Sequence, residues 1–319
     1  MGNSSPEDAE PSLEAPASHV SNSPASTLHG LPLIASSIGG LETSIDLPEW
    51  RCAVDLGRSP ARLLPRATIL ITHAHLDHLG GVAHHCATRS LLGMAPPTYV
   101  IPADIEAPLE RLFAAWRELD SSELPHRLIP ARPGDRIPLR PDLFAMPFRT
   151  IHPVVSQGYT FFSVKKRLRE AYRGLPQKEL QRLATSEGVD LSERTEIPEL
   201  AVTGDSRIEV LDQQPELYQV PRLVLECTFL DDRVDVQRAR TTGHVHLDEI
   251  LERADRFENQ AIGLVHFSAR YSRREILRIL SDRLPASLRE RMTPLFPPRG
   301  EDSPAAVADG LAGESSEFG

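Results

Sequence analysis

The sequence predicts a layered α/β fold with its functional site at the ends of strands. Short apolar runs of strand length alternate with longer runs of helical spacing through the middle of the chain. The polar residues that most need an explanation follow these strand-like runs. In layered α/β folds, strand ends are where loops converge and binding sites form.

The individual elements follow from apolar composition and spacing. Five apolar segments are predicted as buried strands, namely residues 67–72, 143–151, 200–205, 222–229 and 261–267. Helical spacing predicts helices over residues 104–119 and 247–257. A further helical run at residues 274–284 stops at Pro285, where a helix is expected to end.

The two ends of the chain differ from its middle. Residues 1–28 contain four acidic residues and no Lys or Arg, and residues 301–319 contain five acidic residues and again no base. Neither end has apolar periodicity, so we expect disordered acidic tails at residues 1–28 and 300–319 around one folded domain at residues 29–299. Because nine acids lie in the ends, the formal charge of −10 becomes −1 for the domain. The overall acidity therefore does not exclude a nucleic-acid partner.

Cysteine usage and hydropathy indicate a reducing, aqueous compartment. Cys52, Cys86 and Cys227 are scattered and odd in number, which predicts neither a disulfide framework nor a zinc–thiolate site. No apolar run approaches the roughly 18 residues of a membrane span. The N-terminus lacks a signal-peptide layout, and Pro6 departs from the myristoylation pattern. We expect a cytoplasmic protein with no membrane partner.

The densest cluster of metal-ligand residue types is THAHLDHLGG, residues 72–81. His73 and His75 are two apart on an extended segment and can point the same way, and Asp77 and His78 lie just beyond. Imidazole and carboxylate together suit Zn²⁺, with Mn²⁺ or Fe²⁺ as alternatives. Two ions roughly 3.5–4 Å apart can clamp the attacking and leaving oxygens of a phosphoryl displacement. The stretch therefore predicts a metal centre rather than a polar loop with chance histidines.

Other candidate residues leave two roles open when each is taken alone. Asp205 follows a strand and could serve a turn as well as a metal, and His266 could be a core histidine. His244 and His246 precede a helix and could cap it or be solvated. Glu226 lies in an apolar strand, where an unpaired carboxylate is costly. It should therefore have a buried partner, for which His244 is a candidate.

Five further polar residues have surface or structural alternatives. His84, His85 and His126 are expected to be structural or surface residues. Ser268 and Arg270 could contact a phosphate or begin the following helix.

The motifs resemble those of a known family. H-x-H-x-D-H at residues 73–78 is the motif of the metallo-β-lactamase fold and alone indicates a metallohydrolase. TIHPVVSQGY, AVTGDS, LECTFLDD, GHVHLDEI and VHFSARY then follow in the order of the later motifs of ribonuclease Z, the tRNA 3′-processing endoribonuclease. The chain resembles the short, plant-like form from about Leu31 to about Pro285. The resemblance implies a four-layer αββα sandwich with a short inserted arm at about residues 164–200.

The resemblance also implies a role for each candidate residue. One Zn²⁺ would be held by His73, His75 and His152, a second by Asp77, His78 and His266, and both by Asp205. Asp77 would accept a proton from the attacking water. His244 would help to protonate the leaving oxygen, and Glu226 would orient His244. The implied reaction is attack of a metal-bound hydroxide on the phosphodiester after the discriminator nucleotide, which leaves a 3′-hydroxyl on the tRNA.

The family's arm grips tRNA, and in a homodimer the arm of one subunit serves the site of the other. Here residues 165–182 contain seven basic and two acidic residues, a net charge of +5. That imbalance favours phosphate binding over a solvated helix face. The candidate RNA-binding residues are Lys165, Lys166, Arg167, Arg169, Arg173, Ser268 and Arg270. The arm lacks the Gly-Pro-rich tip of long-arm bacterial enzymes, and the N-terminal region lacks their CCA-sensing loop.

Two other functions stay open at this point. The first is a general metallo-phosphodiesterase or other hydrolase of the same fold acting on a small substrate, because a fold hosts many chemistries. The second is a non-catalytic RNA-binding protein. The basic arm and the HFSARY segment favour RNA as the substrate, and the seven filled ligand positions favour an active enzyme.

Overall fold

The structure is a computed structural model and describes residues 26–298. Most of both predicted acidic tails, residues 1–28 and 300–319, lies outside the described residues. Residues 26–28 are the exception, because they form strand β1 (Ser26–Leu28), which pairs antiparallel with the next strand. The ordered fold thus begins before the predicted boundary at residue 29, and buried Leu28 explains why.

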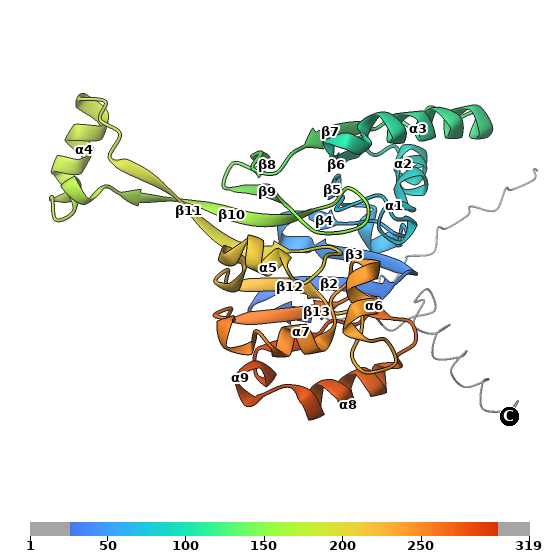
Figure 1. Cartoon of the computed structure of the whole chain (residues 1–319). Helices are drawn as coiled ribbons and strands as arrows, with labels where there is room; N and C mark the ends of the chain where they lie inside the picture. Colours follow the sequence, from blue (N-terminus) through green and yellow to red (C-terminus); the bar gives the residue numbers. More distant parts are fainter. Residues whose placement is uncertain (1–25, 299–319) are drawn as a thin grey trace, which may run out of the picture.

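Two mixed β-sheets form the centre of the molecule (Figure 1). The first has the strand order β1-β2-β3-β4-β5-β6-β7, with β14 paired to β2. Its strands are β1, β2 (Leu31–Gly39), β3 (Glu42–Leu47), β4 (Cys52–Val54), β5 (Thr68–Leu70), β6 (Thr98–Pro102), β7 (Arg127–Ala131) and β14 (Phe267–Ser268).

The second sheet has the strand order β15-β13-β12-β11-β10-β9-β8. Its strands are β8 (Ile137–Arg140), β9 (Leu143–Arg149), β10 (Gln157–Leu168), β11 (Ser192–Val202), β12 (Arg222–Glu226), β13 (Ala261–Val265) and β15 (Met292–Pro294). Four of the five predicted strand segments contain a shorter observed strand, namely β5, β9, β12 or β13. The fifth, residues 200–205, overlaps only the end of β11, which extends into the arm.

Helices cover the outer face of each sheet. The α-helices are α1 (Leu76–Leu79), α2 (Val82–Leu91), α3 (Glu106–Asp120), α4 (Gln177–Ser186), α5 (Val210–Gln213), α6 (Val236–Thr242), α7 (Leu247–Leu251), α8 (Arg273–Arg283) and α9 (Ala286–Arg289). Apolar residues of α2 and α3 pack on the first sheet, and those of α5, α7, α8 and α9 on the second. The predicted four-layer αββα architecture is confirmed.

Burial of both sheet faces explains why the strands read as continuous apolar runs. In β12, Val224 faces the core between the sheets, whereas Leu223 and Leu225 belong to the core under the outer helices. Period-two alternation therefore distributes apolar side chains to two cores instead of to a core and to solvent. Within residues 26–298, no helix is long and apolar enough to cross a membrane.

The predicted arm is a two-stranded extension of the second sheet. Strands β10 and β11 pair antiparallel out to Leu168 and Ser192, beyond the body of the sandwich. Figure 1 shows this ribbon leaving the body and ending in α4, far from α1.

Strand direction brings the candidate residues to one edge. β9 and β11 both run antiparallel to β10, and β11, β12 and β13 are mutually parallel, so their carboxyl ends meet at the same edge. The segment after β5 joins this edge through an isolated bridge between His73 and Ser156.

A matched pair of phenylalanines tests the position of the inner core. Phe161 is fully buried between the sheets and lies beside Trp50, with 5.1 Å between ring centroids. Phe161→Ala should lower the free energy of unfolding by about 3–5 kcal/mol, because it leaves a cavity. Phe162→Ala, at the half-buried next position, should cost clearly less in the same denaturant titration. An equal effect of the two substitutions would contradict the assigned core.

Candidate metal centre

The strand ends bring seven histidine and aspartate side chains into one cluster. They come from the segments after β5, β9, β11 and β13, and they are the residues singled out from the sequence. Together with His244, which follows α6, these seven form three groups whose ligand atoms lie within 4.8 Å of one another: His73, His75, His152 and Asp205; Asp77, His78 and His266; and Asp205, His244 and His266.

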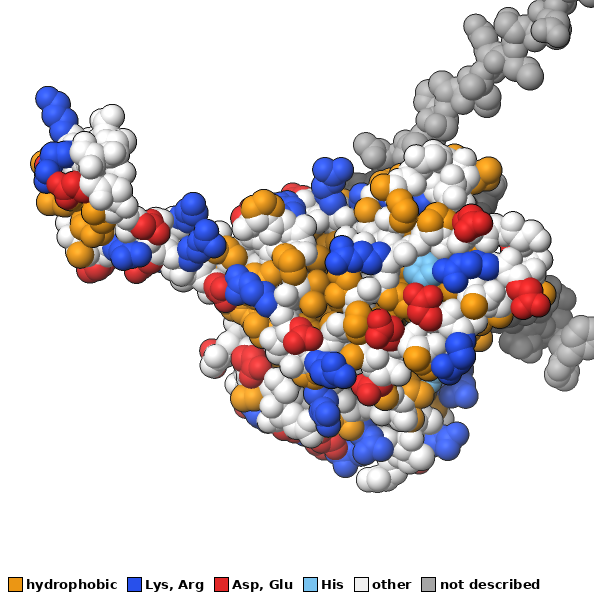
Figure 2. All heavy atoms as spheres, turned by 90° about the horizontal axis from the view of Figure 1, so that it is seen from above, with side chains coloured by type: hydrophobic (Ala, Val, Ile, Leu, Met, Phe, Trp, Pro, Cys, Tyr) orange, Lys and Arg blue, Asp and Glu red, His pale blue; other side chains and the backbone are white. Residues whose placement is uncertain are grey.

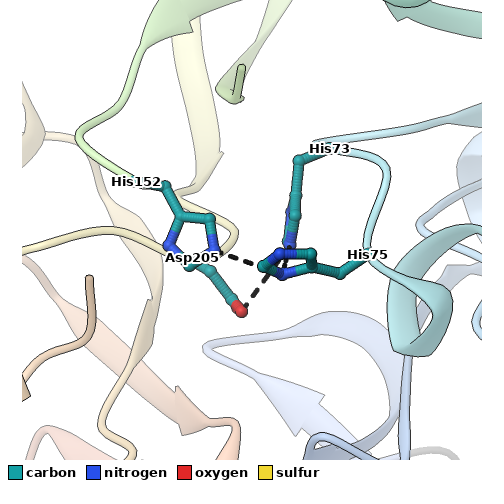
Figure 3. Close-up of side chains that lie close together, drawn as sticks. All are labelled: His73, His75, His152 and Asp205. Atoms are coloured by element: carbon teal, nitrogen blue, oxygen red, sulfur yellow. Dashed lines mark hydrogen bonds and ion pairs between the residues drawn. The ribbon is translucent and has the colours of Figure 1, made fainter. Parts of the chain in front are cut away.

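The first group surrounds a common point. His75 Nδ1 lies 3.0 Å from His73 Nε2 and 3.3 Å from His152 Nε2. Asp205 Oδ2 lies 3.8 Å from His73 Nε2. Figure 3 shows the three imidazoles and the carboxylate converging from three different segments of the chain.

The second group lies on the other side of Asp205. Asp205 Oδ2 is 3.3 Å from Nε2 of both His78 and His266. His266 Nε2 is also 3.4 Å from Asp77 Oδ2. Asp205 thus stands between the two groups, where one carboxylate can serve two cations.

The donor set fits a divalent metal of the zinc type. All members offer nitrogen or oxygen, which suits Zn²⁺, Mn²⁺ or Fe²⁺. Asp205 Oδ1 is buried and has no hydrogen-bond partner among residues 26–298. A buried carboxylate oxygen without a donor is costly unless a cation takes its lone pair.

The second ring nitrogen of four histidines is held by the protein. Nδ1 of His78 lies 2.7 Å from Asp55 Oδ2, and Nδ1 of His152 lies 3.0 Å from the carbonyl oxygen of Gly243. Nδ1 of both His73 and His266 lies 3.0 Å from a threonine hydroxyl. These contacts leave Nε2 of each ring for the cluster, as expected of metal-binding histidines. His75 differs, because it presents Nδ1.

The backbone around the cluster is closely packed and locally strained. Asp55 and His266 have φ values of 61° and 63°, in the left-handed region that non-glycine residues seldom adopt. A Cβ atom on Gly57 would lie 1.9 Å from the carbonyl oxygen of Asp77, so only glycine fits there. Gly40 N–H donates to Asp77 Oδ2 at 2.8 Å.

Burial and mutual proximity shift the pKa values of the cluster in opposite directions. Burial lowers the pKa of His73 well below its ordinary value. Burial raises the pKa of Asp205, but the nearby His266 and His78 more than offset this and hold it well below its usual range. The pKa of Asp77 is also lowered, because a hydrogen bond from His266 and the charge of His78 outweigh its burial. Both carboxylates are therefore ionised at neutral pH.

Beside the cluster, His244 pairs with Glu226, as the sequence led us to expect. His244 Nδ1 lies 3.0 Å from Glu226 Oε1. Burial lowers the pKa of His244, but the Glu226 carboxylate more than offsets this and raises it to about 9. Since Nδ1 is committed to Glu226, the exposed side of the ring is Nε2. His246, by contrast, caps α7.

The remaining candidates lie at the surface or in the helical layers. His84 is exposed on α2, whereas buried His85 lies 2.9 Å from the hydroxyl of Tyr99. His126 stacks on Phe113 with 3.6 Å between ring centroids. None of these three joins the metal-type groups formed by the described residues.

The candidate RNA-binding residues occupy two separate places. Ser268 lies two residues after His266, and Arg270 is exposed beyond it. Neither begins a helix, because Ser272 caps α8. The other five are exposed on the arm, far from the cluster; they are Lys165, Lys166, Arg167, Arg169 and Arg173.

Three residues that touch the cluster were not predicted from the sequence. Asp55 holds His78, and Thr72 and Thr228 hold His73 and His266. All three are buried. Their residue types are common in turns and strands, so a polar residue directly before or after a strand was the one available hint.

Comparison with known proteins identifies relatives across most of the chain. No family model matches. The chain is 43% identical to tRNase Z TRZ1 of Arabidopsis thaliana over 251 residues, which cover 78% of this chain and 89% of that protein. It is 37% identical to the chloroplastic tRNase Z TRZ2 of the same plant over 75% of this chain and 68% of that protein.

Solved structures share the fold at low sequence identity. The metallo-β-lactamase fold protein YhfI from Bacillus subtilis matches with a TM-score of 0.54 at 14% identity, over 84% of this chain and 96% of that chain. The short form of human tRNase Z matches with a TM-score of 0.50 at 18% identity, over 75% of this chain and 93% of that chain. The fold is therefore that of the metallo-β-lactamases.

The geometry predicts the metal stoichiometry. Protein prepared without chelator should contain close to two zinc or similar ions per chain by elemental analysis. Asp205→Ala should reduce this to one or fewer, because Asp205 belongs to both groups. His84→Ala, which changes an exposed histidine outside the cluster, should retain both ions. Equal metal content in all three proteins would contradict the assigned centre.

Proposed function

We propose the function from one premise, which is that this chain belongs to the ribonuclease Z (tRNase Z) family. The protein is a metal-dependent endoribonuclease that removes 3′ trailers from precursor tRNA. The observation that carries this assignment is the cluster at the strand ends, where seven ligand-type side chains stand beside the His244–Glu226 pair.

The cluster has the composition and size for two Zn²⁺ ions. His73, His75 and His152 would hold one ion and Asp77, His78 and His266 the other, with Asp205 shared between them. When bound, such ions lower the pKa of water and stabilise negative charge on phosphate oxygens. His244 also lies near Asp205 and His266, but its Nδ1 is committed to Glu226, so we assign it to proton transfer and not to the metal.

Asp77 is placed to receive the proton of the attacking water. Its hydrogen bonds within residues 26–298 are all made by Oδ2, to Gly40 and His266, which leaves Oδ1 to accept from water. Its lowered pKa keeps it ionised at neutral pH. As the water oxygen bonds to phosphorus, the P–O3′ bond breaks, and the trailer keeps the 5′-phosphate.

His244 is placed to protonate the leaving O3′ atom. Because its pKa is raised to about 9, the ring carries both protons at neutral pH. One proton is donated to Glu226 Oε1, and the Nε2 proton is available for the oxygen that leaves with the tRNA body. The product then ends in a 3′-hydroxyl.

The arm supports binding of a large polyanion, although the whole arm carries a smaller net positive charge than residues 165–182 alone. The net charge of +5 on residues 165–182 is followed by one basic and five acidic residues at 183–200, so the whole arm carries +1. Arg167 lies opposite Glu193, and Arg173 pairs with Glu170. Figure 2 shows acidic side chains interspersed with the basic ones along the arm.

Two lysines are among the basic residues of the arm that lack such compensation. Lys165 lies opposite Thr195, and Lys166 lies opposite Arg194. Neither lysine takes part in an ion pair among those formed by residues 26–298. Like charges directly opposite each other destabilise a sheet. A phosphate bound beside Lys166 and Arg194 would offset this repulsion, which supports a role for both residues in RNA binding.

The arm also supports assembly as a homodimer. Its tip at α4 lies far from the strand edge that carries the cluster (Figure 1), so a tRNA bound there and cleaved at the same subunit's metals would have to span that distance. In a dimer the arm of one subunit serves the site of the other. Sedimentation at micromolar concentration tests this, and a monomer that cleaves at full rate would contradict it.

We place the protein in the cytoplasm, where thiols stay reduced. All three cysteines are free and buried, and no disulfide joins them. One relative is named as chloroplastic and another as nuclear, so the compartment is best tested by imaging a fluorescent fusion of the full chain. Accumulation in an organelle would overturn this placement.

The function is tested by mapping the cut in a 3′-extended precursor tRNA. We expect one cut after the discriminator nucleotide, with a 3′-hydroxyl on the tRNA. Asp77→Asn should slow the reaction by roughly 10²–10⁴-fold, because the new side chain cannot accept the proton. His84→Ala should cleave normally. A cut elsewhere, or equal activity of Asp77→Asn and the natural protein, would contradict the assignment.

A second test separates a tRNA nuclease from a general phosphodiesterase. Replacing Lys165 and Lys166 by Ala should weaken binding of precursor tRNA. The slope of its salt dependence should flatten by roughly 0.9 for each phosphate that the arm no longer neutralises. Hydrolysis of bis(p-nitrophenyl) phosphate should not change, since screening beyond about 8 Å isolates the arm from the cluster.

The matched control for the arm replaces Arg173 and Arg182, whose charges are already paired with glutamates. Its effect on tRNA binding should be smaller. If both double variants bind tRNA as the natural protein does, the arm does not bind RNA. In that case a phosphodiesterase acting on small substrates becomes the better assignment.

A further inference from the structure

We propose that Thr72 and Thr228 are positioning residues that select which nitrogen of His73 and His266 faces the metal centre. Each hydroxyl lies between a buried carboxylate and an imidazole Nδ1. The inference rests on the proposed function and deepens it, because it explains how the same centre is held in its binding-competent form.

The first arrangement lies behind His73. Thr72 Oγ1 is 2.8 Å from Asp55 Oδ2 and 3.0 Å from Asp55 Oδ1, and it is also 3.0 Å from His73 Nδ1. Asp55, Thr72 and His73 are all buried, with at most 1% of each residue exposed. These hydrogen bonds are therefore shielded from bulk water.

The second arrangement repeats the first on the other sheet. Thr228 Oγ1 is 2.6 Å from Glu226 Oε2 and 3.0 Å from His266 Nδ1. Glu226 comes from the end of β12 and His266 from the end of β13, so the chemistry recurs without any relation in sequence.

The number of available hydrogen atoms fixes which group donates and which accepts in both arrangements. A hydroxyl has one hydrogen to donate, and an ionised carboxylate can only accept. The hydrogen of each threonine must therefore point to Asp55 or Glu226, and the hydroxyl oxygen accepts from the imidazole. When a metal occupies the cluster, His73 and His266 would thus be protonated on Nδ1 and would present an unprotonated Nε2 to it.

The hydroxyl lets one carboxylate orient two imidazoles. Asp55 holds His78 directly and His73 through Thr72. Glu226 holds His244 directly and His266 through Thr228. Two buried carboxylates therefore orient four imidazole rings. One ring in each proposed metal site depends on a threonine, namely His73 in the first and His266 in the second.

Valine is the informative replacement because it keeps the shape and removes the hydroxyl. Asp55 would still accept from the backbone N–H of residue 72 and from His78, and Glu226 from the backbone N–H of Val245 and from His244. Neither carboxylate is left without donors. The valine removes one of several donors to the carboxylate together with the acceptor for Nδ1, so that His73 or His266 is free to take the wrong tautomer.

The experiment titrates Zn²⁺ into metal-stripped, full-length protein in competition with a chromophoric chelator. Removal of an outer hydrogen bond to a ligand typically costs 10–100-fold in metal affinity. Thr72→Val and Thr228→Val should each weaken one of two ions by roughly that factor, and the double variant should weaken both. Thr72→Ser and Thr228→Ser should restore binding, because serine keeps the hydroxyl.

A matched control and a spectroscopic readout separate positioning from general damage. Thr203→Val removes a buried hydroxyl that donates to the carbonyl of Gly204 and to no imidazole, and it should bind both ions normally. Long-range ¹⁵N–¹H NMR of the zinc-loaded variants should show a changed signal for His73 or His266 alone.

Three outcomes would overturn the proposal. They are wild-type zinc affinity in both valine variants, failure of serine to restore it, or an equal decrease in Thr203→Val. Because none of these readouts uses RNA, they stand apart from the nuclease assignment. Absence of precursor cleavage by the natural protein would remove that assignment and leave the zinc result intact.

Discussion

A buried carboxylate must find donors for both of its oxygens, and this requirement organises the whole strand edge. Asp55 and Glu226 are each 1% exposed and would cost several kcal/mol if left unpaired. The donors that satisfy them are the backbone and the side chains that build the site. For Glu226 these are the N–H groups of Ser206 and Val245, Thr228 and His244. The side-chain hydrogen bonds that satisfy the two carboxylates therefore also orient the imidazoles.

The proposed function divides into two tasks with different physical ranges, bond breaking at the cluster and RNA binding at the arm. Bond breaking depends on contacts of about 3 Å among buried groups, where a small displacement is costly. Binding of a polyanion depends on exposed charges, which tolerate motion and act over a screening length. The sandwich supplies rigidity for the first, and on the proposed function the β10–β11 ribbon would serve the second, at a distance from the cluster (Figure 1).

The sequence was sufficient for the fold and for the cluster, but not for what surrounds them. Apolar runs predicted a layered α/β fold, and the H-x-H-x-D-H spacing placed His73 to His78 at a strand end. The four-layer sandwich and the inclusion of His152, Asp205 and His266 in the ligand set were implied by the resemblance to ribonuclease Z. Thr72 and Thr228 escaped prediction because each has one partner distant in sequence, Asp55 for Thr72 and His266 for Thr228. The charge of the arm was overestimated because the count ended at Arg182, before the five acidic residues of 183–200. The strand register then shows that one of them, Glu193, lies opposite Arg167. β1 was missed because three residues give no periodicity.

X-ray absorption at the zinc edge, on protein loaded with two zinc ions per chain, tests the central claim most directly. A two-metal centre of histidines and aspartates predicts nitrogen and oxygen ligands at roughly 2.0–2.1 Å and no sulfur shell near 2.3 Å. It also predicts zinc–zinc scattering at roughly 3.5–4 Å. A sulfur shell would place the metal at the cysteines, and two well-coordinated ions without zinc–zinc scattering would mean that Asp205 does not join them. Either result would contradict the account.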